Sequence, residues 1–238
     1  MYKKQTISVV IPTYNEEDSI GFVIKDFKKL GFIDEIIVID NNSKDLTVQI
    51  ATKLGAKIIK EKKQGYGYAC IKGLKEAKKD LIILVEGDYT FDAKDTKRFL
   101  EQIDNYDMII GSRTTKGWYS KKSHMPWYVV FGNNILANIL KWTYNYKHKL
   151  NDIGCTYRII KQNSLKKFIN KLKIGGCDFT PELTIEALKS NLNIKQIPIK
   201  YKERRGETKL SMNWIQSLKI GIFHLKLIIN KRTKKKIY

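Results

Sequence analysis

Hydrophobic residues in the first half of the chain form short runs that alternate with longer stretches of helical spacing. Continuous apolar runs of this kind are typical of strands buried on both faces of a parallel sheet. We predict strands at Ile7–Ile11, Glu35–Ile39, Lys57–Ile59, Leu81–Val85 and Met108–Ile110. We predict helices between them at Glu17–Leu30, Leu46–Leu54, Tyr66–Lys78 and Asp92–Ile103. The alternation indicates an α/β fold, a mostly parallel sheet with helices on both faces.

After Ile110 the pattern becomes basic, aromatic and rich in turns, and helices prevail over strands. We predict helices at Ile135–Tyr146, Ser164–Leu172 and Cys177–Ser190, a strand at Asn193–Glu203 and an amphipathic helix at Asn213–Ile229. No linker, repeat or low-complexity segment interrupts the chain before its lysine-rich end. We therefore expect one domain, whose second half completes a cleft begun by the first.

Polar residues follow the predicted strands at their carboxyl ends. The first strand leads into PTYNEE, the second into DNNSKD, the third toward KKQGYGYA and the fourth into EGDYT. In a parallel sheet these ends share one rim, where ligands of α/β folds bind. Glu86 and Asp88 lie two residues apart, and Gly87 between them lets a ligand approach the backbone. Such a pair suits a divalent cation that clamps a diphosphate, although alone it would also fit a solvated turn.

Other residues on this rim suit a nucleoside. Tyr14 can stack on a base, while Glu16 and Asp40 can accept hydrogen bonds from the base and the ribose. Asn15 with the following glutamates would also cap the first helix, and the two roles can coexist. The GYGYAC segment is not a dinucleotide fingerprint, because Cys70 takes the place of the third glycine. This argues against a nicotinamide enzyme.

Composition narrows the class of partner and the compartment. The 238 residues include 45 Lys or Arg and 24 Asp or Glu, so a net charge of +21 predicts attraction to polyanions. The lysines are dispersed and no nucleic-acid-binding motif occurs, so nucleic acid is not the expected partner. Three cysteines without CxxC spacing argue against a disulfide framework or a zinc site. Because the N-terminus also lacks signal-peptide features, we expect a reducing cytosol.

Several motifs in a fixed order resemble a known family. They are SVVIPTYNEEDSI, EIIVIDNNSKDLT, GYGYACIKGL, LIILVEGDYTF, MIIGSR, FGNN, NDIGCTYR, PEL and RRGETKL. In this order the sequence resembles the family 2 glycosyltransferases of the dolichol-phosphate mannose synthase type. The resemblance implies a GT-A fold over residues 1–210, with a nucleotide-sugar half (1–110) and an acceptor half (111–210). It also implies that a hexose moves, with inversion, from a GDP-mannose or UDP-glucose type donor to a dolichyl or undecaprenyl phosphate.

The resemblance also assigns site residues by position. The expected nucleotide-sugar contacts are Pro12, Tyr14, Glu16, Val38, Asp40, Glu86, Gly87 and Asp88. Asp88 and Glu86 occupy the family's DxD site and would hold Mg²⁺ or Mn²⁺, with Glu86 standing for the usual Asp. The expected catalytic residues are Asp88, Arg113, Asp152, Arg204, Arg205 and Lys209. The adjacent arginines leave open which of them matches the family's basic segment.

A phosphate acceptor agrees with the basic residues of the second half. A phosphate monoester has a second pKa of about 6, so at neutral pH it is a nucleophile that needs no general base. The site must then supply positive charge and alignment. Arg158 is a further candidate, although a structural pair with Asp152 explains it equally well. A hydroxyl acceptor would instead need a base, for which the candidates are Asp152, Asp178 and Glu182.

Two segments have the composition of membrane-surface elements. Residues 116–130 mix lysines with Trp118, Tyr119, Trp127 and Tyr128. The tail 211–238 combines an amphipathic helix with the basic cluster KRTKKK, and its charged interruptions argue against a spanning helix. We predict peripheral association with an anionic membrane surface from the cytoplasm. Packing of the tail on the protein, or on a membrane-spanning partner subunit, is equally open.

Two other activities fit parts of the pattern. A transferase of the same fold could act on a saccharide hydroxyl of a polysaccharide or glycan. A sugar nucleotidyltransferase would carry a glycine-rich basic loop after the first strand, where this chain has PTYNEE.

Overall fold

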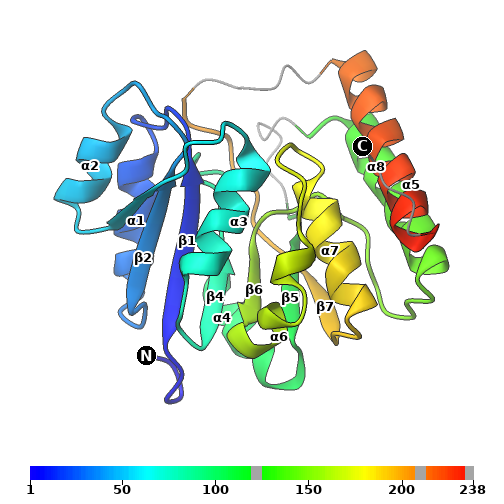
Figure 1. Ribbon diagram of the computed structural model, residues 1–238, viewed down its shortest axis with the longest axis horizontal. Helices are drawn as coiled ribbons and strands as arrows, with labels where there is room; N and C mark the ends of the chain where they lie inside the picture. The colour runs from blue at the N-terminus through cyan, green and yellow to red at the C-terminus, as the bar shows by residue number, and fades with distance from the viewer. Residues whose placement is uncertain (119–124, 207–212, 234–238) are drawn as a thin grey trace.

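The computed structural model describes residues 1–118, 125–206 and 213–233 (Figure 1). Its strands are β1 (Ile7–Thr13), β2 (Glu35–Asp40), β3 (Lys57–Lys60), β4 (Leu81–Leu84), β5 (Met108–Ser112), β6 (Arg158–Lys161) and β7 (Ile194–Pro198). Its α-helices are α1 (Ile20–Lys28), α2 (Thr47–Lys53), α3 (Tyr66–Glu76), α4 (Asp95–Leu100), α5 (Trp127–Thr143), α6 (Gln162–Lys166), α7 (Phe179–Lys189) and α8 (Trp214–Thr233). Short 3₁₀ turns occur at Ile103–Asn105 and Ile169–Lys171.

The described strands form one seven-stranded sheet in the order β3-β2-β1-β4-β6-β5-β7. β6 runs antiparallel to β4 and β5, and the other neighbouring strands are parallel. Every residue of β1 and β4 is buried, as the continuous apolar runs indicate. Figure 1 shows α3 and α7 in front of the sheet and α1 behind it. The predicted α/β fold with a mostly parallel sheet is confirmed.

The sequence pattern does not predict β6, the one antiparallel strand of the described sheet. This strand is four residues long and begins with Arg158, whose side chain is fully buried. An arginine at the start of so short a run makes the segment look like a loop, because arginine is rarely buried. β6 lies between β4 and β5 and thereby joins the two halves of the chain in one sheet.

A second hydrophobic cluster, separate from the core around the sheet, joins α5, α7 and α8. Ala137 and Leu140 of α5 pack there with Ile185 of α7 and with Leu227 and Ile228 of α8. Figure 1 shows α5 and α8 side by side at the edge of the molecule remote from α2. One face of α8 therefore packs on the protein, which was one of the alternatives for the tail.

Ionic contacts fasten the last turns of α8 to α7. The Lys231 ammonium lies 2.7 Å from Glu182 and 2.8 Å from Glu186, and both glutamates are buried. Glu182 also accepts hydrogen bonds from the N–H groups of Lys173 and Ile174. None of the helices in the described ranges is long and apolar enough to cross a bilayer.

Several predicted boundaries differ from the structure. α5 begins already at Trp127, and the helix expected at Ser164–Leu172 is divided into α6 and a 3₁₀ turn. The predicted cap at Asn15 is wrong, because α1 begins only at Ile20. Asn15 instead adopts a left-handed φ of 51°, and its side chain accepts the Lys44 N–H at 2.8 Å. It therefore ties two rim loops together rather than starting a helix.

Candidate active site

A cavity of about 570 Å³ opens beyond the carboxyl ends of β1 and β4, on the rim that the sequence pattern indicates. Its walls come from both halves of the chain. Pro12 lies near the end of β1 and Tyr14 follows that strand, while the segment from Glu86 to Asp88 follows β4. From the second half come Arg113 after β5, residues of the loops that precede β6 and α7, and Tyr201, Lys202 and Arg204 after β7. The cavity is of the size that small ligands occupy.

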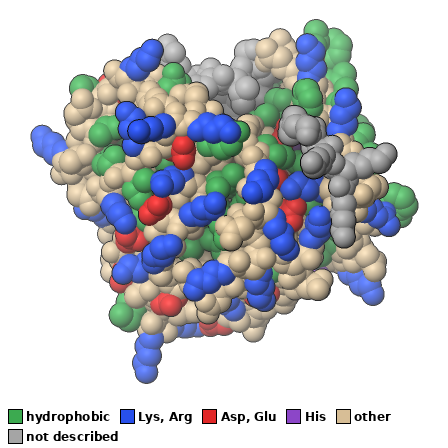
Figure 2. All heavy atoms as spheres, in the orientation of Figure 1, with side chains coloured by type: hydrophobic (Ala, Val, Ile, Leu, Met, Phe, Trp, Pro, Cys, Tyr) green, Lys and Arg blue, Asp and Glu red, His purple; other side chains and the backbone are tan. Residues whose placement is uncertain are grey.

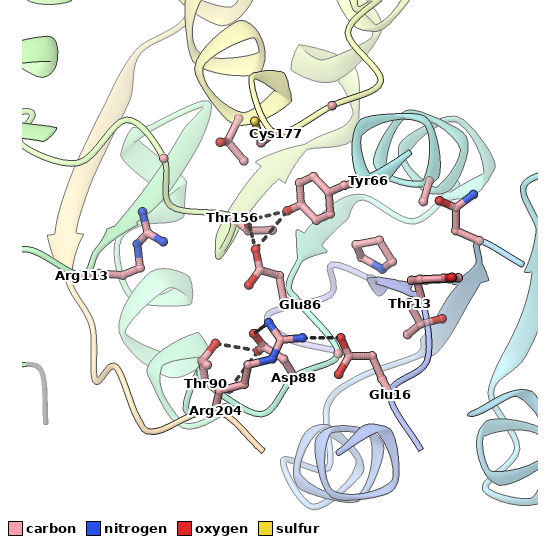
Figure 3. A pocket seen from close by; sticks show the side chains of 18 of the residues that line it. Thr13, Glu16, Tyr66, Glu86, Asp88, Thr90, Arg113, Thr156, Cys177 and Arg204 are labelled. Carbon is pink, nitrogen blue, oxygen red and sulfur yellow. Dashed lines mark hydrogen bonds and ion pairs between the residues drawn. The ribbon is translucent and has the colours of Figure 1, made fainter. Parts of the chain in front are cut away.

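Asp88 lies at the base of this cavity and is only 3% exposed. Its Oδ1 accepts hydrogen bonds from the Thr90 N–H at 3.1 Å and the Thr90 hydroxyl at 2.7 Å. Its Oδ2 accepts a hydrogen bond from Arg204 Nη1 at 3.1 Å (Figure 3). These contacts hold the carboxylate in one orientation and offset part of the cost of burying its charge.

Glu86 lines the same cavity but is held by neutral groups. Its Oε1 accepts hydrogen bonds from the Thr156 hydroxyl at 2.6 Å and the Tyr66 hydroxyl at 3.3 Å (Figure 3). Burial, with a smaller contribution from the charge of Asp88, raises the pKa of Glu86 to about 7. Glu86 is thus held by neutral hydroxyls, whereas Asp88 in the same cavity has a cationic partner, Arg204.

Gly87, between these acids, is required by packing. A Cβ added at Gly87 would lie 2.9 Å from the Thr13 side chain, closer than carbon atoms approach one another. The glycine therefore lets the loop after β4 approach the end of β1, and it also lines the cavity.

Arg113 and Asp152 form a buried, bidentate ion pair. Arg113 Nε and Nη2 lie 2.9 Å from the two carboxylate oxygens of Asp152, and the Arg113 N–H donates to the same carboxylate. Burial alone would raise the pKa of Asp152, but Arg113 holds it below its ordinary value. Burial alone would likewise lower the pKa of Arg113, yet Asp152 raises it. Asp152 is fully buried and does not line the cavity, whereas Arg113 does.

The expected pairing of Arg158 with Asp152 is wrong. Arg158 donates hydrogen bonds to the Cys155 carbonyl and the Thr184 hydroxyl, inside the protein. Burial lowers the pKa of this arginine. Asp152 is already engaged on both oxygens by Arg113, so it has no geometry left for a second guanidinium.

The remaining nucleotide-sugar candidates lie at different depths. Pro12, Tyr14 and Glu16 line the cavity. Asp40 ends β2 opposite Thr13, and its Oδ1 accepts the Ser43 N–H at 2.9 Å. Asp40 thus lies beside the cavity rather than in its wall. The structure places Val38 in the hydrophobic core, fully buried, away from the cavity wall.

The two adjacent arginines point in different directions. Arg204 lines the cavity and contacts Asp88 and Glu16, whereas the Arg205 guanidinium stacks over Phe22 at 4.1 Å and Tyr89 at 5.0 Å. Of the pair, Arg204 is therefore the one directed at the site. Lys209, the last of the basic candidates, lies outside the described residues.

Comparison with known proteins agrees with this geometry. Residues 8–169 match the sequence profile of Glycosyl transferase family 2. The chain is a family 2 glycosyltransferase. A dolichyl-phosphate hexose transferase of Haloferax volcanii is 30% identical over 210 residues, which cover 88% of each chain. The low-salt glycan biosynthesis hexosyltransferase Agl6 of the same organism is 30% identical over 211 residues, 86% of this chain and 50% of that protein.

Solved structures share the fold of this glycosyltransferase. Glucosyl-3-phosphoglycerate synthase from Mycobacterium tuberculosis, in complex with Mn²⁺, uridine diphosphate and phosphoglyceric acid, superposes with a TM-score of 0.73. The sequence identity is 18%, and the match covers 98% of this chain and 80% of the synthase. At this identity the likeness establishes the fold alone, which is GT-A.

The carboxylates of the glycosyltransferase fit a divalent cation that is bound partly by the protein and partly by a substrate. Among the described residues no group of three or more His, Cys, Asp or Glu could enclose a metal ion. Magnesium, however, is commonly held by one or two carboxylates together with substrate phosphates. Asp88 already binds one cation, the guanidinium of Arg204, and Glu86 lies in the same wall. The residues present therefore suit a metal that arrives with a diphosphate.

Sequence reasoning missed several residues of the cavity wall. They are Asn41, Gln64, Tyr66, Thr90, Thr156, Thr180, Tyr201 and Lys202. The place of Thr90 could have been found, because an aspartate side chain often accepts a hydrogen bond from the backbone two residues on. Asn41 fastens the loop after β3 by donating to the carbonyls of Glu61 and Lys63 and accepting from Gly65. Nothing local in the sequence indicates those long-range bonds.

Proposed function

We propose that this glycosyltransferase moves a hexose from a nucleotide sugar to the phosphate of a polyprenyl phosphate. The observation that carries the proposal is that carboxylates and basic side chains line one cavity together. The carboxylates of Glu16, Glu86 and Asp88 come from the first half of the chain, and the basic side chains of Arg113, Lys202 and Arg204 come from the second half. Carboxylates suit a cation-bound diphosphate, while arginine and lysine suit the phosphate of an acceptor.

On the donor side, Tyr14 and Pro12 would contact the nucleoside, with Asp40 and Asn41 beside them. Asp88, with Glu86, would hold Mg²⁺ or Mn²⁺, which neutralises the departing diphosphate. The synthase of the same fold was crystallised with Mn²⁺ and uridine diphosphate, which supports a metal and a nucleotide donor. Residues 1–110 would thus form the donor half, 111–210 the acceptor half and 211–238 the membrane-associating tail.

On the acceptor side, the phosphate oxygen attacks the anomeric carbon as the bond to the diphosphate breaks, and the configuration inverts. No proton has to be removed, because the phosphate is already an anion. Arg113 supplies positive charge, and Asp152 positions it by accepting hydrogen bonds from two of its nitrogen atoms. The name of the Haloferax relative, a dolichyl-phosphate hexose transferase, supports a lipid phosphate as acceptor.

A saccharide hydroxyl as acceptor fits the geometry less well, because it needs a general base in the cavity. Of the three acids considered for that role, none lines the cavity. Asp152 is bound by Arg113, Glu182 is bound by Lys231, and Asp178 lies 3.0 Å from His224 of α8. These contacts exclude the three acids from that role, so a hydroxyl acceptor would have to use Glu86 of the cavity wall, which the proposal assigns to the metal.

Exposed apolar side chains on α5 and α8 support a membrane-bound acceptor. On α5 they lie at helical spacing and include Trp127 (78% exposed) and Phe131 (61%). On α8, Trp214, Leu218 and Ile222 are exposed, whereas the buried residues His224, Leu227 and Ile228 lie in its second half. Figure 2 shows hydrophobic side chains along the edge of the molecule formed by α8. We call these exposed residues of α5 and α8 the apolar face.

The occupant we propose for the apolar face is an anionic membrane surface at the cytoplasmic side. Exposed Lys219, Lys226 and Arg232 flank the apolar residues of α8, which is the mixture that interfacial helices present to anionic lipids. Figure 2 shows lysines and arginines spread over the visible face, in keeping with a net charge of +21. A spread of this kind favours a broad anionic surface over a single acidic partner site.

The test is a transfer assay with a panel of labelled sugar nucleotides, Mg²⁺ or Mn²⁺, and either a short polyprenyl phosphate or soluble oligosaccharides. We expect label in an acid-labile, solvent-extractable lipid with one of the donors. Label that enters only the oligosaccharides would contradict the proposal and establish the hydroxyl acceptor instead.

A further inference from the structure

Arg204 bridges two carboxylates across the candidate active site. Its Nη1 lies 3.1 Å from Asp88 Oδ2, and its Nη2 lies 2.7 Å from Glu16 Oε1. Figure 3 shows the guanidinium between these acids, inside the cavity that the donor would occupy. The side chain of Arg204 is 22% exposed, and those of Asp88 and Glu16 are nearly buried.

Both oxygens of Asp88 are already engaged in this arrangement. Oδ1 accepts two hydrogen bonds from Thr90, which belongs to the same loop, and Oδ2 accepts the bond from Arg204. A cation that approaches Asp88 Oδ2 therefore meets the guanidinium of Arg204 on the same oxygen. The Thr90 contacts are local and stay in place, whereas the Arg204 contact joins residues 116 positions apart in the chain. A divalent cation would also repel the guanidinium at this distance.

The backbone around Arg204 allows the side chain to move alone. The Arg205 N–H donates to the Asp88 carbonyl at 3.1 Å, and the Lys202 N–H donates to the Thr90 carbonyl at 2.8 Å. These bonds fasten residues 202–205 to the loop after β4, and Arg205 stacks away from the cavity. Release of Arg204 from Asp88 thus requires rotation of side-chain torsions and no change in the strand order.

We propose that Arg204 acts as an internal counter-ion that competes with the divalent cation for Asp88. In the free protein the guanidinium neutralises Asp88 and Glu16. When a cation reaches Asp88 with the donor diphosphate, Arg204 is released into the acceptor side of the cavity, where it can bind a phosphate. This inference rests on the proposed function for its last step alone. It makes Arg204 available to the acceptor only after the donor has bound.

The competition is tested by Mn²⁺ binding to the full chain without nucleotide or lipid, followed by electron paramagnetic resonance of the free ion. Arg204→Gln removes the competitor, and we expect about 10-fold tighter binding of Mn²⁺ than in the wild type. Arg204→Lys keeps the charge but loses the bidentate contact, so its Mn²⁺ affinity should lie between those of the wild type and Arg204→Gln. Arg205→Gln makes the same change in net charge at the neighbouring residue and should leave Mn²⁺ affinity unchanged.

Two results would overturn the inference. One is equal Mn²⁺ affinity in Arg204→Gln and the wild type, with both folded by circular dichroism. The other is an equal gain in Arg205→Gln, which would show that net charge alone is responsible. The gain must also disappear in the Arg204→Gln, Asp88→Asn double variant. Because these measurements use no sugar nucleotide or lipid, failure to find a lipid product would reject the proposed function and leave this inference standing.

Discussion

Around the ends of β1, β2 and β4 the chain buries polar side chains, whereas along α5 and α8 it exposes apolar ones. Asp88 is 3% exposed in the first region, and Trp127 is 78% exposed in the second. Both reverse the usual distribution, in which charge lies outside and large apolar groups lie inside. Burying carboxylates costs free energy unless a cation approaches them, and exposing aromatic rings costs free energy unless an apolar phase covers them. The two regions therefore indicate two ligands of opposite character.

The largest effect on activity is expected from a substitution in the polar region. Asp88→Asn keeps the acceptor atoms for Thr90 but removes the negative charge that would hold the metal and diphosphate. We expect hexose transfer to fall by at least about 100-fold, as when a main electrostatic group is lost from an active site. Initial rates at saturating donor would measure it. Asp104→Asn is the control, since Asp104 is half exposed and pairs with Lys3 at the surface. Equal loss of activity in both variants would refute the role of Asp88.

The next effect concerns the buried ion pair that positions Arg113. Asp152→Asn leaves Arg113 without its counter-ion in a largely buried position, so we expect the free energy of unfolding to fall by about 3 kcal/mol. Urea denaturation measures this loss. Asp104→Asn, which breaks the exposed pair with Lys3, should change stability by less than about 1 kcal/mol.

The same pair predicts a dependence on pH with a definite sign. The folded-state pKa of Asp152 lies below the ordinary value of 3.8, so the pair stabilises the protein above about pH 4. This stabilisation is lost as the pH falls through the lowered pKa, where the folded carboxylate is finally protonated. The stability gap between the wild type and Asp152→Asn should therefore narrow below pH 4. A gap that stayed constant down to pH 3 would mean that the charge of Asp152 does not matter.

These two regions were not equally predictable from the sequence. Strand ends marked by PTYNEE, DNNSKD and EGDYT identify the rim, because burial on both faces forces polar residues to the strand tips. The register of the two arginines could not be read, since only the packing of Phe22 and Tyr89 decides that Arg205 turns outward. The sequence also led us to expect Val38 in contact with the nucleotide sugar and Arg158 paired with Asp152. Both side chains are packed elsewhere, because the burial of a side chain depends on neighbours remote in sequence.

The apolar face, too, could be predicted from the sequence only in part. The pattern predicted an amphipathic helix in the tail, and α8 is present. Which of its faces packs on α5 and α7 depends on contacts such as Lys231 with Glu182, which no local pattern reveals. The role of the exposed face stays a prediction that binding experiments can test.

A moderate effect is expected when the apolar face is made polar. The double variant Trp214→Ser, Leu218→Ser removes two exposed side chains of α8 without touching its buried face. We expect binding to vesicles that contain anionic lipid to weaken by about 10-fold. Leu46→Ser is the control, because Leu46, directly before α2, is as exposed as Leu218, at 56%. Equal loss in the control, or no loss in the double variant, would disprove the assignment of this face.

The smallest effect is expected from a substitution that tests the contribution of charge, rather than of apolar contact, to membrane binding. Arg232→Gln removes one exposed cation near the end of α8 and should weaken binding to anionic vesicles by about 5-fold. The difference should vanish with neutral lipids or at high salt, because the screening length then becomes short. Co-sedimentation at two salt concentrations measures it, and a loss that persisted in neutral vesicles would indicate a structural defect instead.

The most direct test asks whether both regions serve one reaction. Hexose transfer would be measured for the wild type and the Trp214→Ser, Leu218→Ser variant, with a long polyprenyl phosphate in anionic vesicles and with a short, water-soluble isoprenyl phosphate. The account predicts that the variant loses most of its activity on the vesicles and keeps wild-type activity on the soluble acceptor. Equal activity of the two proteins on the vesicles, or no transfer to either phosphate by the wild type, would contradict it.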